Sequence, residues 1–328
     1  MTAPDPPRAD LVLEGGGVRG VALVGAVLAL AEAGYGFPRV AGSSAGAVTA
    51  ALVAALQRAG EPVERLDGLL RELDLRAVGG RRLPLPLAAP GLALGLVLRE
   101  GLHSTRALRT WLGGQLADLG VRTFGDLRLP PDPGGDLAPD RRYRLVVTAT
   151  DVSRGRLALL PWDARDGYGL DPDDLDVVTA VTASAAIPFW FRPVRLPTGR
   201  GTEATLVDGG VVSNFPVGVF DRTDGRRPRW PTFGVRLSED DDRVRPVRDP
   251  LTLLVRLVET LVLAGDRRRT DDPCVRARSV YVDTAGTSLV DFDLPPERRD
   301  ALVERGREAA RAFLAGWDHD RYLARGRP

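Results

Sequence analysis

The chain has 328 residues, of which 44% are hydrophobic and 27% are charged, as in ordinary soluble globular proteins. Its net charge of +1 argues against nucleic acid as a partner, and its single cysteine, Cys274, excludes an intramolecular disulfide and a cysteine-based metal cluster. The N-terminal residues do not resemble a signal peptide, and no uninterrupted apolar stretch reaches about 18 residues. We therefore expect a cytoplasmic protein without a transmembrane helix, with peripheral contact to a membrane left open.

The first sixty residues predict two strand–helix units after a disordered tail over 1–9. The apolar run Leu11–Leu13 ends in glycines and predicts a buried strand, and an apolar helix is expected over 20–34. A second strand through Val40 leads into a helix over 45–59. Two strand–glycine turn–helix units in succession imply a parallel sheet with helices on its faces.

The remaining elements continue this pattern and predict one α/β unit. Helical spacing is found over 62–74, 104–119, 173–185, 250–265 and 295–315. Runs typical of strands are found at 143–150, 155–160, 204–208, 232–237 and 279–283. The segment 83–98 is strongly apolar but broken by proline and glycine, so it is either a lipid-facing cap or a buried core helix.

The first chemical motif is the glycine run from Gly15 to Gly20, "GGGVRG", between a strand and a helix. It matches a dinucleotide-binding fingerprint, but such a unit should end its second strand in an acidic residue, and here that strand runs into "AGSSAG". The same glycines can instead point backbone N–H groups into one space at the positive end of a helix dipole, where an oxyanion would be stabilised.

The second motif is Gly42 to Gly46, "GSSAG", a G-x-S-x-G pattern between a predicted strand and a predicted helix. In a nucleophile elbow Ser44 stands clear of a strained turn, and the Ala45 N–H joins the oxyanion hole. The alternative is that Ser43 or Ser44 caps the helix that follows.

The third motif supplies a base. Asp208 ends an apolar strand and is followed by Gly209 and Gly210, so its carboxylate can face a crevice at the sheet edge. The alternative is an aspartate in an ordinary turn. His103 precedes a good capping pair and is expected to pack or cap, and His319 lies in a polar tail and is expected at the surface.

Together, in this order, the three motifs resemble those of the patatin-like phospholipase family over about residues 10–240. The resemblance implies a three-layer α/β/α fold with a mainly parallel central sheet and an apolar cap, with 241–328 as a helix-rich completion of the same domain. It implies a Ser44–Asp208 dyad without histidine, and neither a metal nor an organic cofactor. It further implies oxyanion donors at Gly15, Gly16, Gly17 and Ala45, and motif-supporting residues Arg19, Gly20, Gly42, Gly46, Gly209 and Gly210.

The function implied by this resemblance is hydrolysis of lipid acyl esters, of the phospholipase A or lysophospholipase type, through an acyl-enzyme. A broad carboxylesterase or an acyltransferase on the same dyad, and a non-catalytic lipid-binding module, stay open. Arg19 holds a phosphate or the surroundings of the oxyanion, or is an ordinary solvated or ion-paired arginine. Phe189 stands where the family usually has glycine, Ser184 either lines the site or packs in the core, and the oligomeric state is left open.

Overall fold

The computed structural model describes the chain from Pro6 to Ala324 with several gaps. The described residues are 6–79, 101–131, 137–199, 201–238, 246–247, 253, 256–257, 260–261 and 272–324. The expected cap segment over 83–98 lies outside these residues, as does most of the helix expected over 250–265.

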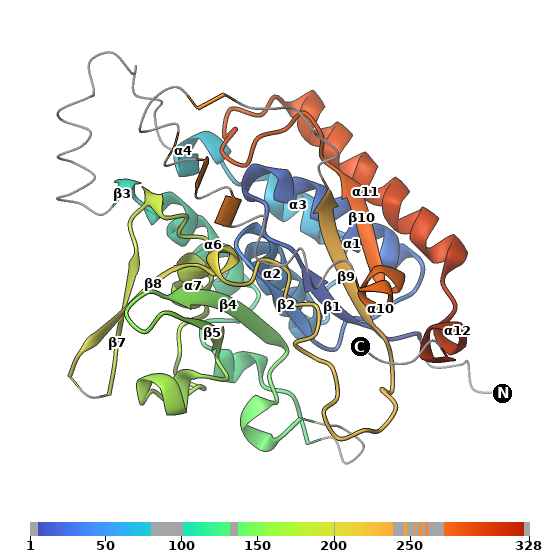
Figure 1. The fold of residues 1–328 in the computed structure, drawn as a ribbon, viewed down its shortest axis with the longest axis horizontal. Helices are drawn as coiled ribbons and strands as arrows, with labels where there is room; N and C mark the ends of the chain where they lie inside the picture. Colours follow the sequence, from blue (N-terminus) through green and yellow to red (C-terminus); the bar gives the residue numbers. More distant parts are fainter. Residues whose placement is uncertain are drawn as a thin grey trace.

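Among the described residues, eight strands form a central sheet in the order β10-β9-β1-β2-β4-β8-β7, with β5 paired to β4 off this path (Figure 1). Their bounds are β1 Asp10–Leu13, β2 Val40–Gly42, β4 Leu145–Asp151, β5 Arg156–Leu160, β7 Val194–Pro197, β8 Glu203–Asp208, β9 Thr232–Ser238 and β10 Ser279–Asp283. The neighbours β10, β9, β1, β2 and β4 run parallel, whereas β5 and β8 are antiparallel to β4, and β7 is antiparallel to β8. A second, two-stranded sheet pairs β3 (Gly101–His103) with β6 (Phe189–Phe191).

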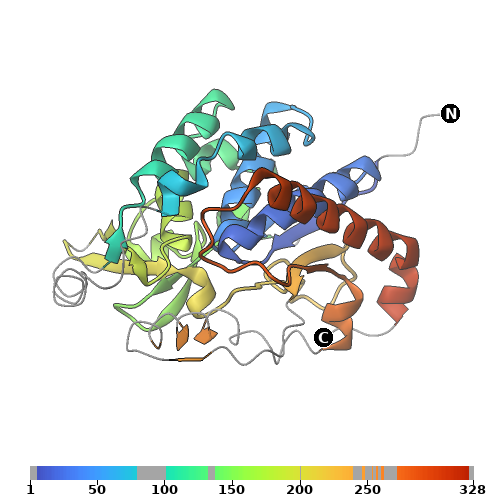
Figure 2. The ribbon, with the colours of Figure 1, turned by 90° about the horizontal axis from the view of Figure 1, so that it is seen from above.

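The helices gather mainly on one side of the sheet. Their bounds are α1 Val21–Glu32, α2 Ala45–Ala59, α3 Arg65–Arg71, α4 Leu75–Gly79, α6 Arg106–Asp118, α7 Val177–Ser184, α10 Pro273–Ala277, α11 Pro296–Gly316 and α12 His319–Ala324. Figure 2 shows the blue helices α1 and α2, the teal helix α6 and the red helix α11 together on one side. The expected α/β fold with a mainly parallel sheet is confirmed.

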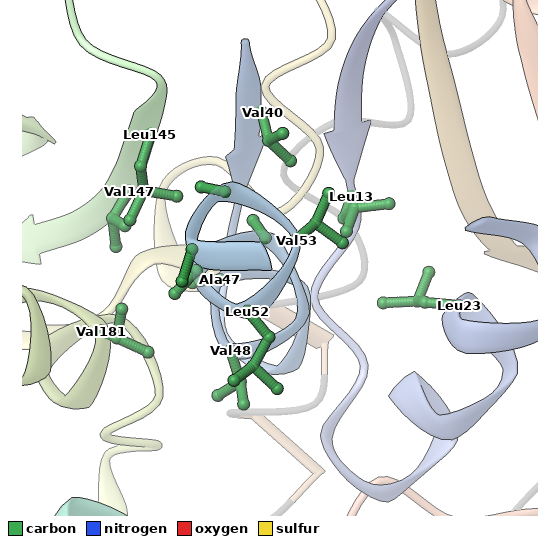
Figure 3. Packing of buried hydrophobic residues seen from close by; sticks show 14 of the residues in the cluster. Leu13, Leu23, Val40, Ala47, Val48, Leu52, Val53, Leu145, Val147 and Val181 are labelled. Carbon is green, nitrogen blue, oxygen red and sulfur yellow. The ribbon is translucent and has the colours of Figure 1, made fainter. Parts of the chain in front are cut away.

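The core follows from the period-two alternation of the buried strands. Leu13, Val40 and Val147 face the helices, and Val53 of α2 lies beside Leu13, whereas Leu52 lies on the side of α2 turned away from the strands (Figure 3). The intervening Val12, Ala41 and Val146 face the other way, against a second cluster that contains Phe215, Val217, Phe220 and Val275. On the described residues, the second outer layer is therefore the segment 213–221 and the short α10 rather than a row of helices.

The C-terminal elements add to the same sheet and pack against the same helices. β10 adds a parallel strand beside β9, and α11 packs along α1. The two helices approach closely because glycines lie between them, and a Cβ on Gly25 would meet the Val303 carbonyl oxygen at 1.7 Å. The 45–59 helix has the expected bounds, and the 295–315 helix is shifted by one residue to 296–316.

Several boundaries differ from expectation for local reasons. The N-terminal tail does not extend to residue 9, because Ala9 N–H donates to the Gly36 carbonyl and Gly36 N–H donates to Pro7. The helix expected from 173 begins at Val177, where the Asp176 side chain caps it by accepting from the Thr179 N–H. In the described part of the chain, no helix combines the length and the apolar character needed to cross a membrane.

Candidate active site

The glycine loop follows the carboxyl end of β1 and is held by Asn214. Gly15 N–H donates to the Asn214 carbonyl at 3.1 Å, and the Asn214 amide donates back to the Gly15 carbonyl at 2.9 Å. Gly17 has φ +52°, a left-handed conformation that favours glycine, and it begins the 3-10 turn Gly17–Gly20 that leads into α1. Both the N–H and the carbonyl of Gly15 are therefore held by Asn214.

Ser44 lies in a strained turn between β2 and α2. Its φ of 51° and ψ of −123° are unusual for a residue with a side chain, a strain of about 1–3 kcal/mol. Burial of one or two core side chains such as Leu52 offsets a strain of this size. The Ser44 N–H donates to the Ser184 hydroxyl at 2.8 Å, which holds the turn from α7.

The glycines on both sides of Ser44 allow β1, β2 and α2 to meet. A Cβ on Gly46 would lie 2.3 Å from the Leu13 carbonyl oxygen, and a Cβ on Gly42 would lie 2.3 Å from the Gly46 carbonyl oxygen. A Cβ on Gly15 would lie 3.0 Å from the Ser44 Cβ, so the glycine loop and the serine turn are adjacent. The structure thus brings the first two motifs into one site.

The two neighbouring serines have different hydrogen-bond partners. The Ser43 hydroxyl donates to the Ser213 carbonyl at 3.2 Å and accepts from the Thr148 hydroxyl at 2.8 Å. The Ser44 hydroxyl makes no capping hydrogen bond to α2. The alternative of a simple helix cap therefore finds no support at either serine.

Asp208 ends β8, where it pairs with Ala149 of β4. Its side chain is almost fully buried, and one carboxylate oxygen accepts from the Gly210 N–H at 2.8 Å. Burial raises the pKa of Asp208 to about 7, while hydrogen bonds from the Ser44 hydroxyl and the Gly210 N–H act in the opposite direction. The carboxylate and the Ser44 hydroxyl are thus neighbours, and desolvation dominates the charge state of the acid.

The backbone N–H groups around Ser44 differ in availability. The N–H groups of Gly16, Gly17 and Ala45 donate to no acceptor among the described residues. The N–H of Gly15 is already bonded to Asn214, which corrects the expectation that it serves as an oxyanion donor.

The motif-supporting residues pack close to the same site. A Cβ on Gly20 would lie 2.5 Å from the Ala45 Cβ, and a Cβ on Gly209 would lie 2.2 Å from the Thr148 hydroxyl oxygen. Gly210 holds the Asp208 carboxylate through its N–H. Arg19 has no exposed surface, so it is a buried residue of the loop rather than a solvated arginine.

The two histidines lie apart from this hydrogen-bond network. His103 packs on Trp190 with ring centroids 5.3 Å apart, and burial lowers its pKa. His319 stacks on Trp317 in the C-terminal region, and burial lowers its pKa as well. Neither makes a hydrogen bond to Ser44 or Asp208. His103 packs as expected, whereas His319, which was expected at the surface, is half-buried.

Phe189 occupies a backbone conformation that suits the glycine usual in the family. Its φ is 66°, and its side chain is 44% exposed. Trp190 and Phe191 contact Phe292 instead of extending toward solvent. Trp162 packs on Phe220 at the other face of the sheet. These four aromatic residues therefore divide between core contacts and one exposed ring.

Sequence reasoning missed the role of Asn214 and left Ser184 undecided. Asn214 lies six residues after Asp208 in the stretch "LVDGGVVSNFP", and this closeness to the third motif could have indicated that it belongs to the site. Ser184 binds Ser44 across 140 residues of chain, for which no local pattern exists. In the part of the chain that the structure describes, no group of three or more His, Cys, Asp or Glu residues has a geometry suited to a metal ion.

Comparisons with known proteins identify the family. A family model described as patatin-like phospholipase matches residues 11–221. YqhO of Bacillus subtilis (strain 168), an uncharacterised protein, is 34% identical over 316 residues, which cover 94% of this chain and 99% of that protein. An uncharacterised NTE family protein of Mycobacterium bovis, Mb2594, is 26% identical and aligns with 93% of this chain but 46% of its own length. The crystal structure of VipD from Legionella pneumophila shares the fold, with a TM-score of 0.50 at 17% identity over 97% of this chain and 69% of VipD. The chain belongs to the patatin-like phospholipase family.

Proposed function

We propose that this protein hydrolyses acyl esters of phospholipids or lysophospholipids, with Ser44 as nucleophile and Asp208 as general base. The observation that carries the proposal is the pairing of these two residues. A serine in a strained turn at the start of a helix lies beside a buried carboxyl that also accepts from the Gly210 N–H.

In the first step, Asp208 accepts the proton of the Ser44 hydroxyl as Oγ forms a bond to the ester carbonyl carbon. The carbonyl oxygen becomes an oxyanion, and we assign its stabilisation to the N–H groups of Gly16, Gly17 and Ala45. These donors have no other acceptor among the described residues, and the Ala45 N–H begins α2, where the helix dipole favours negative charge.

When the tetrahedral intermediate collapses, the carbon–oxygen bond to the alcohol breaks and Asp208 returns the proton to the leaving oxygen. A water molecule then gives a proton to Asp208 and attacks the acyl carbonyl carbon of the acyl-enzyme. When this second intermediate collapses, the bond from that carbon to Ser44 Oγ breaks, Asp208 returns the proton to Oγ, and the fatty acid is released. An aspartate serves both steps because its raised pKa makes it a better base than an aspartate in water.

An acyl substrate is favoured by the apolar side chains near the dyad. Phe189 is 44% exposed and follows Ala186 in the chain, and Val212 is 41% exposed and follows Asp208. The Asp208 N–H donates to the Ala186 carbonyl at 2.9 Å, which holds these two segments together. Ser44 itself is 4% exposed, so water has little access to the nucleophile before a substrate binds.

The test is labelling with a fluorophosphonate, followed by mass-spectrometric mapping and a substrate panel. We expect label on Ser44, and loss of label and turnover in Ser44→Ala and Asp208→Asn. Ser153→Ala, at an exposed serine, should label like the wild type. Full activity in either dyad variant would refute the assignment.

The panel separates the alternatives. Diacyl phospholipids and lysophospholipids in mixed micelles are compared with a soluble short-chain ester. Each substrate is also assayed with an added alcohol that can accept the acyl group. Faster turnover of the short ester than of any phospholipid indicates a carboxylesterase, and acyl transfer to the alcohol indicates a transferase. Vesicle binding without label or turnover indicates a lipid-binding module.

A further inference from the structure

A second cavity lies at the opposite end of the parallel strands from Ser44. It has a volume of about 570 Å³ and is lined by residues at or next to the amino ends of β1, β2, β4 and β9, including Asp10, Arg39, Arg144 and Thr232. Ser44 follows the carboxyl end of β2. The two sites therefore share strands but not residues.

The cavity is strongly cationic. Seven arginines and two aspartates line it: Arg8, Arg39, Arg142, Arg144, Arg222, Arg229, Arg278, Asp10 and Asp221. Internal ion pairs neutralise part of this charge, since Arg39 pairs with Asp10, Arg278 with Asp221, and Arg222 with Asp224. Both aspartates that line the cavity are thus already paired with an arginine.

Three of the lining arginines have no carboxylate partner among the described residues. Arg144 is half-buried, and its one hydrogen bond goes to the Pro38 carbonyl at 3.3 Å. Arg142 donates to the Leu137 carbonyl at 3.3 Å, and the Arg8 guanidinium lies 5.9 Å from the ring centre of Trp230. Burial without a counter-charge lowers the pKa of Arg144, a cost that a bound anion would remove.

Other donors at the cavity also lack acceptors. Trp230 Nε1 and Arg278 Nε are buried and have no hydrogen-bond partner within the described part of the chain. Buried donors are normally paired, so two of them on residues that line one cavity indicate a missing acceptor. Apolar walls from Phe37, Leu129 and Phe220 line the same space.

We propose that this cavity binds a small organic phosphate, whose phosphoryl oxygens pair with Arg144, Arg142 and Arg8 and whose apolar part lies against Phe220 and Trp230. Arginine pairs with phosphate through two parallel hydrogen bonds, which suits it to this ligand. Three uncompensated guanidinium groups favour a multiply charged phosphate over a single carboxylate. The volume is in the usual range for small-molecule sites.

Isothermal titration calorimetry at low ionic strength tests the proposal with three probes: inorganic pyrophosphate, ADP and dihexanoyl phosphatidic acid below its critical micelle concentration. We expect at least one probe to bind with a Kd below 1 mM, on the order of typical small-molecule affinities. Pyrophosphate or ADP alone indicates a soluble phosphate, and phosphatidic acid alone indicates a lipid headgroup.

Arg144→Gln should weaken the binding at least tenfold, because it removes the half-buried guanidinium. Arg109→Gln, an exposed arginine of α6, is the matched control and should bind like the wild type. If Arg144→Gln does not fold, the same binding measurement is made on Arg142→Gln, which should also weaken the binding. Ser44→Ala should bind unchanged, so failure of the proposed hydrolase would leave this result standing. The proposal would be overturned if no probe binds, or if Arg144→Gln and Arg142→Gln both bind the probe with the affinity of the wild type.

Discussion

Asp208→Asn should make the protein more stable at neutral and alkaline pH while it removes the catalytic base. The folded protein holds the Asp208 proton more tightly than the unfolded chain does, since burial raises the pKa from an ordinary value of about 3.9 to about 7. Between these two values the wild type loses stability as the pH rises, because its folded state binds more protons than its unfolded state. The pKa difference of about three units, at 1.36 kcal/mol per unit, lowers the free energy of unfolding of the wild type by about 4 kcal/mol above pH 7.

The asparagine variant avoids this loss, because its side chain is neutral and can still accept from the Gly210 N–H. We therefore expect Asp208→Asn to exceed the wild type in free energy of unfolding by up to about 4 kcal/mol at pH 8. The gap should shrink through pH 7 to 4 and vanish below pH 4.

Urea unfolding followed by tryptophan fluorescence, at pH values from 4 to 8.5, measures this gap. Asp140→Asn, which removes an exposed carboxylate, is the control and should follow the wild type across the range. A stability difference for Asp208→Asn that is constant with pH would refute the reasoning, because it would mean that burial of the charge does not set the pKa.

The other predictions concern the same site. The kcat/KM of the wild type should fall about tenfold per pH unit below about 7, as a pH–rate profile would show, because the base must be deprotonated; a flat profile down to pH 5 would exclude Asp208 as the base. Ser184→Ala leaves the Ser44 N–H without its acceptor and should cost about 1–3 kcal/mol of stability and lower kcat more than it changes KM, measured by thermal unfolding and kinetics; unchanged kcat would assign Ser184 to packing alone. Gly46→Ala should abolish activity or folding because its Cβ meets the Leu13 carbonyl, whereas Gly68→Ala, in open space on α3, should stabilise by up to about 1 kcal/mol, both measured by circular dichroism.

The sequence predicted those parts of the site that depend on short-range patterns. Apolar runs that end in glycines located β1 and β2, and an apolar run that ends in an aspartate located β8. The same glycines indicated tight turns at Gly15–Gly20 and Gly42–Gly46, because few other residues permit such close backbone approach.

The remaining features depend on contacts between distant segments. The hydrogen bond that the Gly15 N–H donates to the Asn214 carbonyl joins residues 199 positions apart, and it removes the Gly15 N–H from the available donors. The raised pKa of Asp208 arises from burial by several elements, which no local pattern records. The short strands β6 and β7 were missed for the same reason, since they gain their partners β3 and β8 only in the folded chain.

The brevity of β2 has a consequence for how this site tolerates change. Only Val40–Gly42 form the strand, with Arg39 tied to Asp10 before it and Ser44 tied to Ser184 soon after it. Because side chains alternate between faces, one residue inserted or deleted within β2 would turn the strand positions that follow it to the opposite face of the sheet. The number of residues between Arg39 and Ser44 is therefore constrained as strongly as the identity of these two residues. A change in this spacing would displace Ser44 even if no residue of the site were substituted.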